Sequence, residues 1–228
     1  MRFSLLLSDV DNTLFDFRSA ERAAFAAVSA RFALPEDEDL FALYQAINKA
    51  QWQKLDRGET DPQKLRLDRF RDFADALGLE GADIRAMSDH YIRALGEQRL
   101  LVAGAEAFLR RVSAHMPVYL VTNGFSDVQR PRIQASPLRR YFSGLLISEE
   151  FAHAKPHPEM LQEAMRRAGA ADPSRAVMIG DNEAADIGAA VNAGVKSILF
   201  LNGGTVPAET KADFTANTLE EAAEWILG

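Results

Sequence analysis

The spacing of short apolar runs, interrupted once by a long stretch with no strand-like run, constrains the fold of this chain most strongly. Several runs rich in leucine, valine and isoleucine have the length and composition of buried parallel strands. These runs are Phe3–Leu7, Val118–Val121, Leu145–Ile147, Ala176–Ile179 and Ser197–Leu201. Helical patterns over Pro158–Ala168 and Glu183–Ala193 separate the later runs. Alternating strands and helices predict an α/β fold, a doubly wound parallel sheet with helices on both faces.

The interruption between the first and second runs has the pattern of a helical domain. Residues 16–99 contain only amphipathic helical stretches, namely Ala20–Phe32, Leu40–Arg57, Pro62–Leu77 and Ile84–Leu95. Asp61 followed by Pro62 is typical of an N-cap and the first position of a helix. We therefore predict an all-helical cap domain over residues 16–99, inserted into a Rossmann-like core formed by residues 1–15 and 100–228.

Local signals place several helix ends in the core. Gly194 is suited to end the helix that precedes it, and Thr218 with Glu221 forms a capping box that opens a last helix over Leu219–Leu227. Pro131 falls where a helix after Phe125 is expected. Its ring would remove one backbone hydrogen bond and kink that helix, or delay its start.

Composition excludes several classes of function. The chain has 228 residues, a net charge of −7 and no cysteine, so disulfides and thiolate catalysis are absent and nucleic-acid polymers are poor partners. No segment approaches a membrane span, and we expect a cytoplasmic monomer or weak homodimer. One basic cluster, Arg130, Arg132, Arg139 and Arg140, is interpreted as a solvated face. The histidines, His90, His115, His153 and His157, share no ligand spacing and receive no role.

Polar residues follow the predicted strands directly, where ligands bind in open α/β sheets. They are Asp9-Val10-Asp11-Asn12-Thr13, Thr122-Asn123-Gly124 and Gly180-Asp181-Asn182, with Lys155-Pro156 in a loop after the third run. Crowding Asp9, Asp11 and Asp181 would cost several kcal/mol unless a cation lay among them. Few carboxylate ligands favour Mg²⁺ over Ca²⁺. A cation, an ammonium and a hydroxyl together suit a phosphoryl group.

These motifs, in this order, resemble the haloacid dehalogenase superfamily. The resemblance covers residues 1–15 and about 100–228. It implies that Asp9 attacks phosphorus, while Asp11 protonates the leaving oxygen and later activates water. Mg²⁺ would be held by the Asp9 carboxylate, the Asp11 backbone carbonyl and Asp181. Thr122 and Lys155 would bind phosphate oxygens and complete the catalytic set.

Neighbouring positions complete the implied site. Asn123 and Gly124 would assist Thr122 in phosphate binding, and Asp186 would support the metal site through hydrogen bonds. Dehalogenases of the superfamily lack an aspartate at the position of Asp11, because a halide leaves without a proton. The resemblance therefore implies hydrolysis of small phosphomonoesters through an aspartyl-phosphate.

A finer resemblance concerns the predicted cap. Three stretches are similar to bacterial 5′-nucleotidases acting on non-standard pyrimidine nucleoside monophosphates: residues 11–17, residues 44–49 with Trp52, and residues 122–125. Asn48 and Trp52 share a helix face, with Lys49 offset, and would suit a base through hydrogen bonding and stacking. The alternative for Trp52, Phe41 and Tyr44 is cap core, and for Lys49 a solvated surface.

Other functions stay open at the level of sequence. A phosphatase of small sugar phosphates or phosphoglycolate would use the same core with a different cap. A phosphonatase would need a cap lysine that forms an imine, such as Lys49 or Lys54. From another class, the chain could be a phosphoryl-accepting regulatory module or a catalytically silent one. The early position of Asp9 and the large cap disfavour the phosphoryl-accepting module, and the complete motif set disfavours the silent one.

Overall fold

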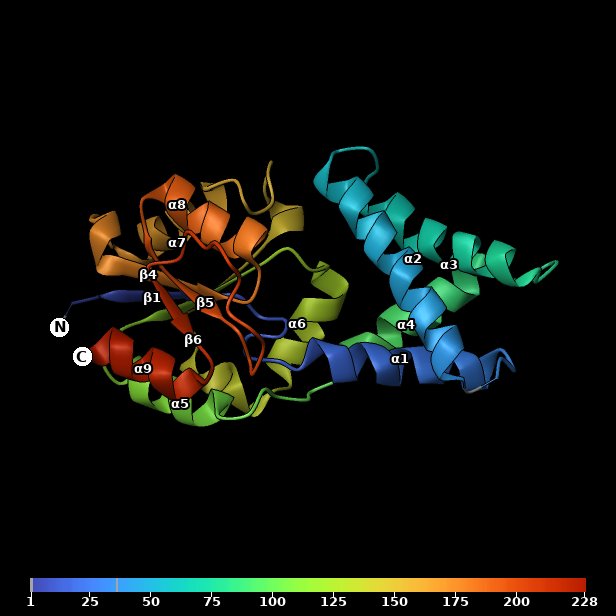
Figure 1. The fold of residues 1–228 in the computed structure, drawn as a ribbon, viewed down its shortest axis with the longest axis horizontal. Helices are drawn as coiled ribbons and strands as arrows, with labels where there is room; N and C mark the ends of the chain where they lie inside the picture. The colour runs from blue at the N-terminus through green and yellow to red at the C-terminus, as the bar shows by residue number, and fades with distance from the viewer. Residues whose placement is uncertain (1, 36) are drawn as a thin grey trace. The chain divides into compact units, whose positions relative to one another are not determined.

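The computed structural model describes residues 2–35 and 37–228, and the chain divides into two compact units. Residues Met1–Phe17 and Arg99–Gly228 form an α/β unit, which we call the core. Residues Arg18–Gln98 form a helical unit, which we call the cap (Figure 1).

The core is built on one parallel sheet. Its strands are β1 (Leu5–Ser8), β2 (Val118–Thr122), β3 (Gly144–Ile147), β4 (Ala176–Gly180), β5 (Lys196–Phe200) and β6 (Phe214–Ala216). Their order in the sheet is β3-β2-β1-β4-β5-β6, so β1 pairs with β2 on one side and β4 on the other. The predicted doubly wound α/β fold is confirmed, and each predicted run overlaps a strand. β6 was not predicted.

Helices cover both faces of this sheet (Figure 1). Helices α5 (Ala105–Ser113) and α9 (Leu219–Leu227) pack on one face, where Leu6 of β1 joins their buried side chains. Helices α7 (Glu159–Ala168) and α8 (Gly188–Ala193) pack on the other, where Leu5 and Leu7 are buried. Successive residues of a strand point to opposite faces, so one apolar run supplies both halves of the core.

The helix ends of the core follow local signals closely. Thr218 and Glu221 form the predicted capping box at α9, and Gly194 ends α8 with a φ of 70°. The helix predicted over Glu183–Ala193 opens with a π-helical turn, η4 (Glu183–Ile187), before α8 begins. Helix α6 (Ser126–Gln134) starts directly after Phe125 and runs through Pro131. Pro131 therefore removes a ladder bond without delaying the helix.

Short 3-10 turns connect the remaining elements of the core. They are η1 (Pro137–Tyr141), η2 (Ser148–Glu150) and η3 (Pro173–Arg175). Turn η1 follows α6, η2 follows β3 and η3 precedes β4.

The cap consists of α1 (Phe17–Arg31), α2 (Glu38–Asp56), α3 (Pro62–Leu77) and α4 (Ile84–Gly96), of which Phe17 belongs to the core unit. Asp61 caps α3 as predicted, accepting hydrogen bonds from the backbone N–H groups of Gln63 and Lys64. The cap has an aromatic interior made by Phe25, Phe41, Tyr44, Phe70, Phe73 and Tyr91. Tyr44 stacks on Phe25 with ring centroids 4.8 Å apart. The cap thus has a hydrophobic core of its own.

Among the helices of residues 2–35 and 37–228, none has the length and apolar character that a membrane crossing requires.

Candidate active site

The first aspartate lies at the end of the central strand. β1 ends at Ser8, and the backbone N–H of Asp9 donates to the carbonyl of Ile179 on β4 at 2.9 Å. The chain then turns tightly, because the N–H groups of Leu14 and Phe15 both donate to the carbonyl of Val10. Asp9 is only 7% exposed. A carboxylate is therefore fixed at the carboxyl edge of the sheet, where ligands bind in this class of fold.

Lys155 links Asp9, which follows β1, to strand β2 and to the turn that follows β4. Its Nζ donates to Asp9 Oδ1 at 2.7 Å, to Asp186 Oδ1 at 2.6 Å and to the carbonyl of Val121 at 2.7 Å. An ammonium has three N–H donors, so this group is fully satisfied. Burial lowers the pKa of Lys155, but the Asp186 and Asp9 carboxylates outweigh burial and raise it. The lysine is therefore a fixed positive charge inside the site.

The loop that carries Lys155 is fastened to the end of β2. The side-chain amide of Asn123 donates to the Lys155 carbonyl at 2.9 Å, and the Lys155 backbone N–H donates to Asn123 Oδ1 at 2.9 Å. This reciprocal pair joins residues that lie 32 positions apart in the sequence. Asn123 therefore positions the lysine loop in this structure.

Asp181 and Asp186 follow β4. Asp186 Oδ2 accepts a hydrogen bond from the Asn182 N–H at 3.0 Å, and its Oδ1 accepts from Lys155. A Cβ at Gly180 would lie 2.2 Å from Asp186 Oδ2, so only glycine permits this approach. One carboxylate oxygen from each of Asp9, Asp181 and Asp186 lies within 4.8 Å of the others.

Two carboxyl groups of this cluster have raised pKa values. The pKa of Asp181 is raised to about 6, mainly by burial and then by Asp186 and Asp11, against the lowering effect of Lys155. Burial also raises the pKa of Asp9 well above its ordinary value; Lys155 lowers it, while Asp186, Asp181 and Asp11 raise it. Repulsion and desolvation thus disfavour full ionisation of the three carboxyl groups. A bound cation would stabilise their ionised forms.

The donor set fits a hard divalent cation. Asp186 accepts short hydrogen bonds at both oxygens, from Lys155 and from the Asn182 N–H, whereas the bond from the Thr13 hydroxyl to Asp9 Oδ2 is long, at 3.4 Å. Asp9 and Asp181 are therefore the carboxylates better placed to ligate a metal. Oxygen ligands in small number, with water completing the shell, are the arrangement that Mg²⁺ prefers.

Thr122 ends β2 beside these groups and is 2% exposed. Its Oγ1 accepts hydrogen bonds from the Gly124 N–H at 3.0 Å and from Gln129 Nε2 at 3.2 Å. Both lone pairs of the hydroxyl are then in use, so its one hydrogen is left for donation. A Cβ at Gly124 would lie 2.3 Å from Gln129 Nε2, which explains a glycine at that position.

Asp11 is held by two residues of α6 that we did not predict. Gln129 Nε2 donates to Asp11 Oδ2 at 2.6 Å, and Arg132 Nη1 donates to Asp11 Oδ1 at 2.6 Å. The interpretation of Arg132 as part of a solvated face was wrong, since the residue is fully buried. Its charge is balanced by Asp11, and its guanidinium lies 5.3 Å from the centroid of the Phe15 ring. A buried arginine without such a partner would be strongly unfavourable.

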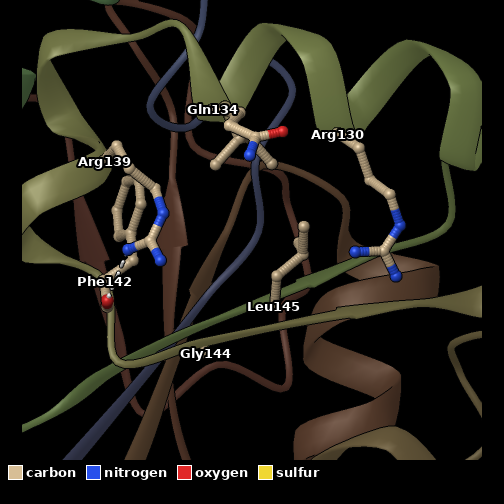
Figure 2. A pocket seen from close by; sticks show the side chains of 7 residues that line it. Arg130, Gln134, Arg139, Phe142, Gly144 and Leu145 are labelled. Carbon is tan, nitrogen blue, oxygen red and sulfur yellow. Dashed lines mark hydrogen bonds between the residues drawn. The ribbon is translucent and has the colours of Figure 1, made fainter.

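A pocket on the other side of α6 is separate from these residues. It has a volume of about 200 Å³ and lies between α6, η1 and β3 (Figure 2). Its lining residues are Arg130, Ile133, Gln134, Arg139, Phe142, Gly144 and Leu145. Arg130 forms an ion pair with Glu150, and Arg139 donates to the Phe142 carbonyl at 3.2 Å. None of the carboxylates described above lines this pocket.

The residues predicted to contact substrate from the cap lie on α2. Asn48 is buried: its amide donates to Glu21 Oε1 at 2.9 Å, and its Oδ1 accepts from Arg69 at 3.4 Å. Lys49 is exposed and Trp52 is half-buried. Their contact with a substrate stays a prediction. The alternative interpretation holds for Phe41 and Tyr44, which are core residues of the cap.

Comparison with known proteins agrees with this fold. Residues 3–194 match the haloacid dehalogenase-like hydrolase family, and the chain belongs to that family. It is 32% identical over 197 residues to the pyrimidine 5′-nucleotidase YjjG of Escherichia coli, covering 86% of this chain and 84% of that protein. It is 28% identical to the pyrimidine 5′-nucleotidase PynA of Streptococcus pneumoniae, covering 88% of this chain and 84% of that one.

Solved structures give the same fold. The HAD-hydrolase YfnB of Bacillus subtilis, crystallised with magnesium, superposes with a TM-score of 0.90 at 28% identity over 99% of both chains. The L-2-haloacid dehalogenase of Xanthobacter autotrophicus superposes with a TM-score of 0.75 at 18% identity, over 99% of both chains, and shares the fold.

Proposed function

We propose that this hydrolase is a magnesium-dependent phosphatase that transfers the phosphoryl group of a small phosphomonoester to Asp9 and then to water. The observation that carries this proposal is the pair of contacts from Lys155 to Asp9 and Asp186, with Asp181 beside them. The Asp9 carboxylate can act as a nucleophile toward a phosphate ester. Because the ester is itself negatively charged, the neighbouring Lys155 ammonium reduces the repulsion between the two anions.

In the first step, an Asp9 carboxylate oxygen forms a bond to phosphorus as the bond from phosphorus to the ester oxygen breaks. The departing oxygen takes a proton from Asp11. Thr122 donates its free hydroxyl hydrogen to a phosphoryl oxygen, while the backbone at Asn123 and Gly124 assists. Lys155 offsets charge and orients Asp9; its direct contact with phosphate would require it to exchange one of its present bonds.

In the second step, water attacks the phosphorus of the aspartyl-phosphate. Asp11, which gave up its proton in the first step, removes a proton from the water. The bond between phosphorus and the Asp9 oxygen breaks, releasing orthophosphate and restoring both carboxyl groups. The Gln129 and Arg132 contacts hold Asp11 in place between the two steps.

Magnesium would be held by the carboxylates of Asp9 and Asp181, with the Asp11 backbone carbonyl as a further ligand. When bound, it supplies positive charge that neutralises the phosphate oxygens and lowers the pKa of the carboxyl groups around it.

The substrate class that we propose is the pyrimidine nucleoside 5′-monophosphates. Support comes from the sequence likeness to two pyrimidine 5′-nucleotidases that spans more than four-fifths of the chain. Asn48, Lys49 and Trp52 are the proposed cap residues for the base, because they combine hydrogen bonding, charge and an aromatic surface.

The mechanism is tested by measuring phosphate release with and without Mg²⁺ for the wild type and Asp9→Asn. Asp75→Asn, on an exposed surface of α3, is the matched control. We expect Mg²⁺-dependent release from the wild type and the control, and none from Asp9→Asn. Full activity in Asp9→Asn would show that Asp9 is not the nucleophile.

The substrate class is tested separately with a panel of esters. Pyrimidine monophosphates, purine monophosphates, phosphoglycolate, phosphoserine and sugar phosphates are compared by kcat/KM. Preference for a pyrimidine monophosphate, weakened in Trp52→Ala, supports the nucleotidase proposal. Preference for a sugar phosphate or phosphoglycolate would refute it and leave the phosphatase chemistry intact.

A further inference from the structure

A second group of ligand-type side chains lies just ahead of α7, outside the proposed active site. It consists of His153, His157 and Glu159, which we call the histidine cluster. The sequence analysis gave these histidines no role, since their spacing fits no familiar metal motif. The loop between η2 and α7 nevertheless brings them together.

The geometry of the cluster is close to that of a metal site. One ligand atom from each residue lies within 4.8 Å of the other two. His153 Nδ1 lies 3.2 Å from Glu159 Oε2. The two imidazole rings are stacked with centroids 4.1 Å apart, so they must unstack before both can point a ring nitrogen at one ion. Adjacent ligand atoms of a tetrahedral zinc ion are separated by about 3.4 Å, as the usual bond lengths require. The pair formed by His153 and Glu159 already has this spacing.

The remaining adjustment involves side chains at the surface. His153 and Glu159 have side chains that are 59% and 36% exposed, and His157 is exposed as well. Among the described residues, the polar contact of the His157 ring is a long hydrogen bond from the Glu159 N–H, at 3.4 Å. Rotation about the side-chain bonds of His157 would unstack its ring from His153 and turn a ring nitrogen toward the other two ligands, without loss of a buried contact.

The donor set decides which metal fits. Two imidazoles and one carboxylate favour zinc, nickel, cobalt or copper, whereas Mg²⁺ and Ca²⁺ prefer oxygen ligands. We infer that the histidine cluster is a binding site for a divalent transition metal, with zinc as its typical occupant. Three protein ligands leave one coordination position for water. This site is chemically distinct from the oxygen-only site at Asp9 and Asp181.

The position of the cluster gives it a route to the active site. His153 and His157 flank Lys155, whose Nζ contacts Asp9 and whose backbone is held by Asn123. A metal bound by His153, His157 and Glu159 would tie both ends of this short loop to the start of α7. Occupancy would therefore restrict the segment that positions Lys155.

Zinc binding to the whole chain, measured by calorimetry in excess Mg²⁺, tests the inference. Excess Mg²⁺ occupies the oxygen site, and the double variant Asp9→Asn with Asp181→Asn provides a background in which that site is disabled. We expect one equivalent of zinc in both proteins. This equivalent should be lost in His153→Ala and in His157→Ala, and bind more weakly in Glu159→Gln. His115→Ala, which removes an exposed histidine elsewhere, should retain it.

A second measurement needs no variant of the cluster. Zinc added to the wild type in excess Mg²⁺ should shift the imidazole NMR signals of His153 and His157 and leave those of His90 and His115 unchanged. Zinc that binds with the same affinity after both cluster histidines are removed, or shifts confined to other residues, would overturn the proposal, as would the absence of binding. Each readout is independent of enzymatic activity and so of the proposed function.

Discussion

At the scale of single residues, Asp11 has different partners from the other carboxylates of the site. Asp9 and Asp186 contact an ammonium, whereas Asp11 contacts the Gln129 amide and the Arg132 guanidinium, both from α6. Within the described residues, Arg132 Nε and Nη2 lack a hydrogen-bond partner. Such a buried guanidinium is costly, and its retention beside Asp11 is consistent with a role in holding that carboxylate.

Replacing Arg132 should therefore impair proton donation to the leaving group. For Arg132→Met we expect kcat/KM for a nucleoside monophosphate to fall roughly 10²-fold, the usual size of an acid–base contribution. The loss should be smaller for p-nitrophenyl phosphate, whose leaving group departs without a proton. Steady-state kinetics on both substrates checks this, with Arg139→Met as the matched control. Equal losses on the two substrates would show that Arg132 does not act through Asp11.

Gly180 should be equally sensitive for a steric reason. In Gly180→Ala the new Cβ would meet Asp186 Oδ2 at 2.2 Å and push that carboxylate away from Lys155. We expect a loss of about 1–3 kcal/mol in the free energy of unfolding, as for other overpacked interiors. Urea denaturation measures it, with Lys64→Ala, at an exposed position of α3, as the comparison. A Gly180→Ala protein as stable as Lys64→Ala would contradict the steric account.

At the scale of elements, helix ends illustrate what local sequence can determine. Thr218 accepts a hydrogen bond from the Glu221 N–H at 3.2 Å, and the Glu221 side chain accepts from the backbone N–H groups of Asn217 and Thr218. All of these contacts lie within a few residues of each other. The capping box was therefore predictable without knowledge of the fold.

Removal of this cap gives a quantitative test. Thr218→Ala should lower the free energy of unfolding by about 1 kcal/mol, because the Glu221 N–H loses its acceptor. Thr205→Ala, at an exposed position in the loop after β5, should change it little. Chemical denaturation of the two variants checks the difference. If both threonine variants have the stability of the wild type, the cap contributes nothing to α9.

Elements whose formation depends on distant partners were harder to predict. Strand β6 spans only Phe214–Ala216 and exists because it pairs with β5, so its own sequence has no clear strand period. Helix α5 was missed although Phe108, Leu109 and Val112 form an apolar stripe that could have indicated it. Arg132 looked like a surface residue because its partner, Asp11, lies 121 positions away. The positions of Asp9, Thr122 and Asp181 at strand ends could be inferred from sequence, because parallel strands bring their carboxyl ends to one edge of the sheet.

At the scale of the whole molecule, the carboxylate cluster links stability to pH and to metal. The Asp181 pKa is raised from 3.8 to about 6 by burial first and by Asp186 and Asp11 next, against Lys155. Between these pH values the native state binds more protons than the unfolded state. The free energy of unfolding contributed by Asp181 therefore falls as pH rises through this window and levels off above it.

Mg²⁺ should compensate for this loss. We expect the rise in Tm on adding Mg²⁺ to be small near pH 3.8, where Asp181 is protonated in the native state. The rise should be largest above about pH 6, where Asp181 is ionised. Thermal unfolding with EDTA or Mg²⁺ across this range tests it. In Asp181→Asn the dependence of the Mg²⁺ effect on pH should flatten. Equal stabilisation at every pH, in the wild type, would argue against a metal at this cluster.

The central claim is that Asp9 becomes phosphorylated during turnover, and trapping that bond tests it most directly. The enzyme is acid-quenched during turnover with Mg²⁺, reduced with borohydride, and mapped by peptide mass spectrometry. Reduction of an acyl phosphate would convert Asp9 to homoserine. We predict homoserine at residue 9 only when substrate and Mg²⁺ are both present. Reduction at another residue, or unmodified Asp9 in an enzyme that is turning over and trapped under conditions that preserve acyl phosphates, would contradict the account.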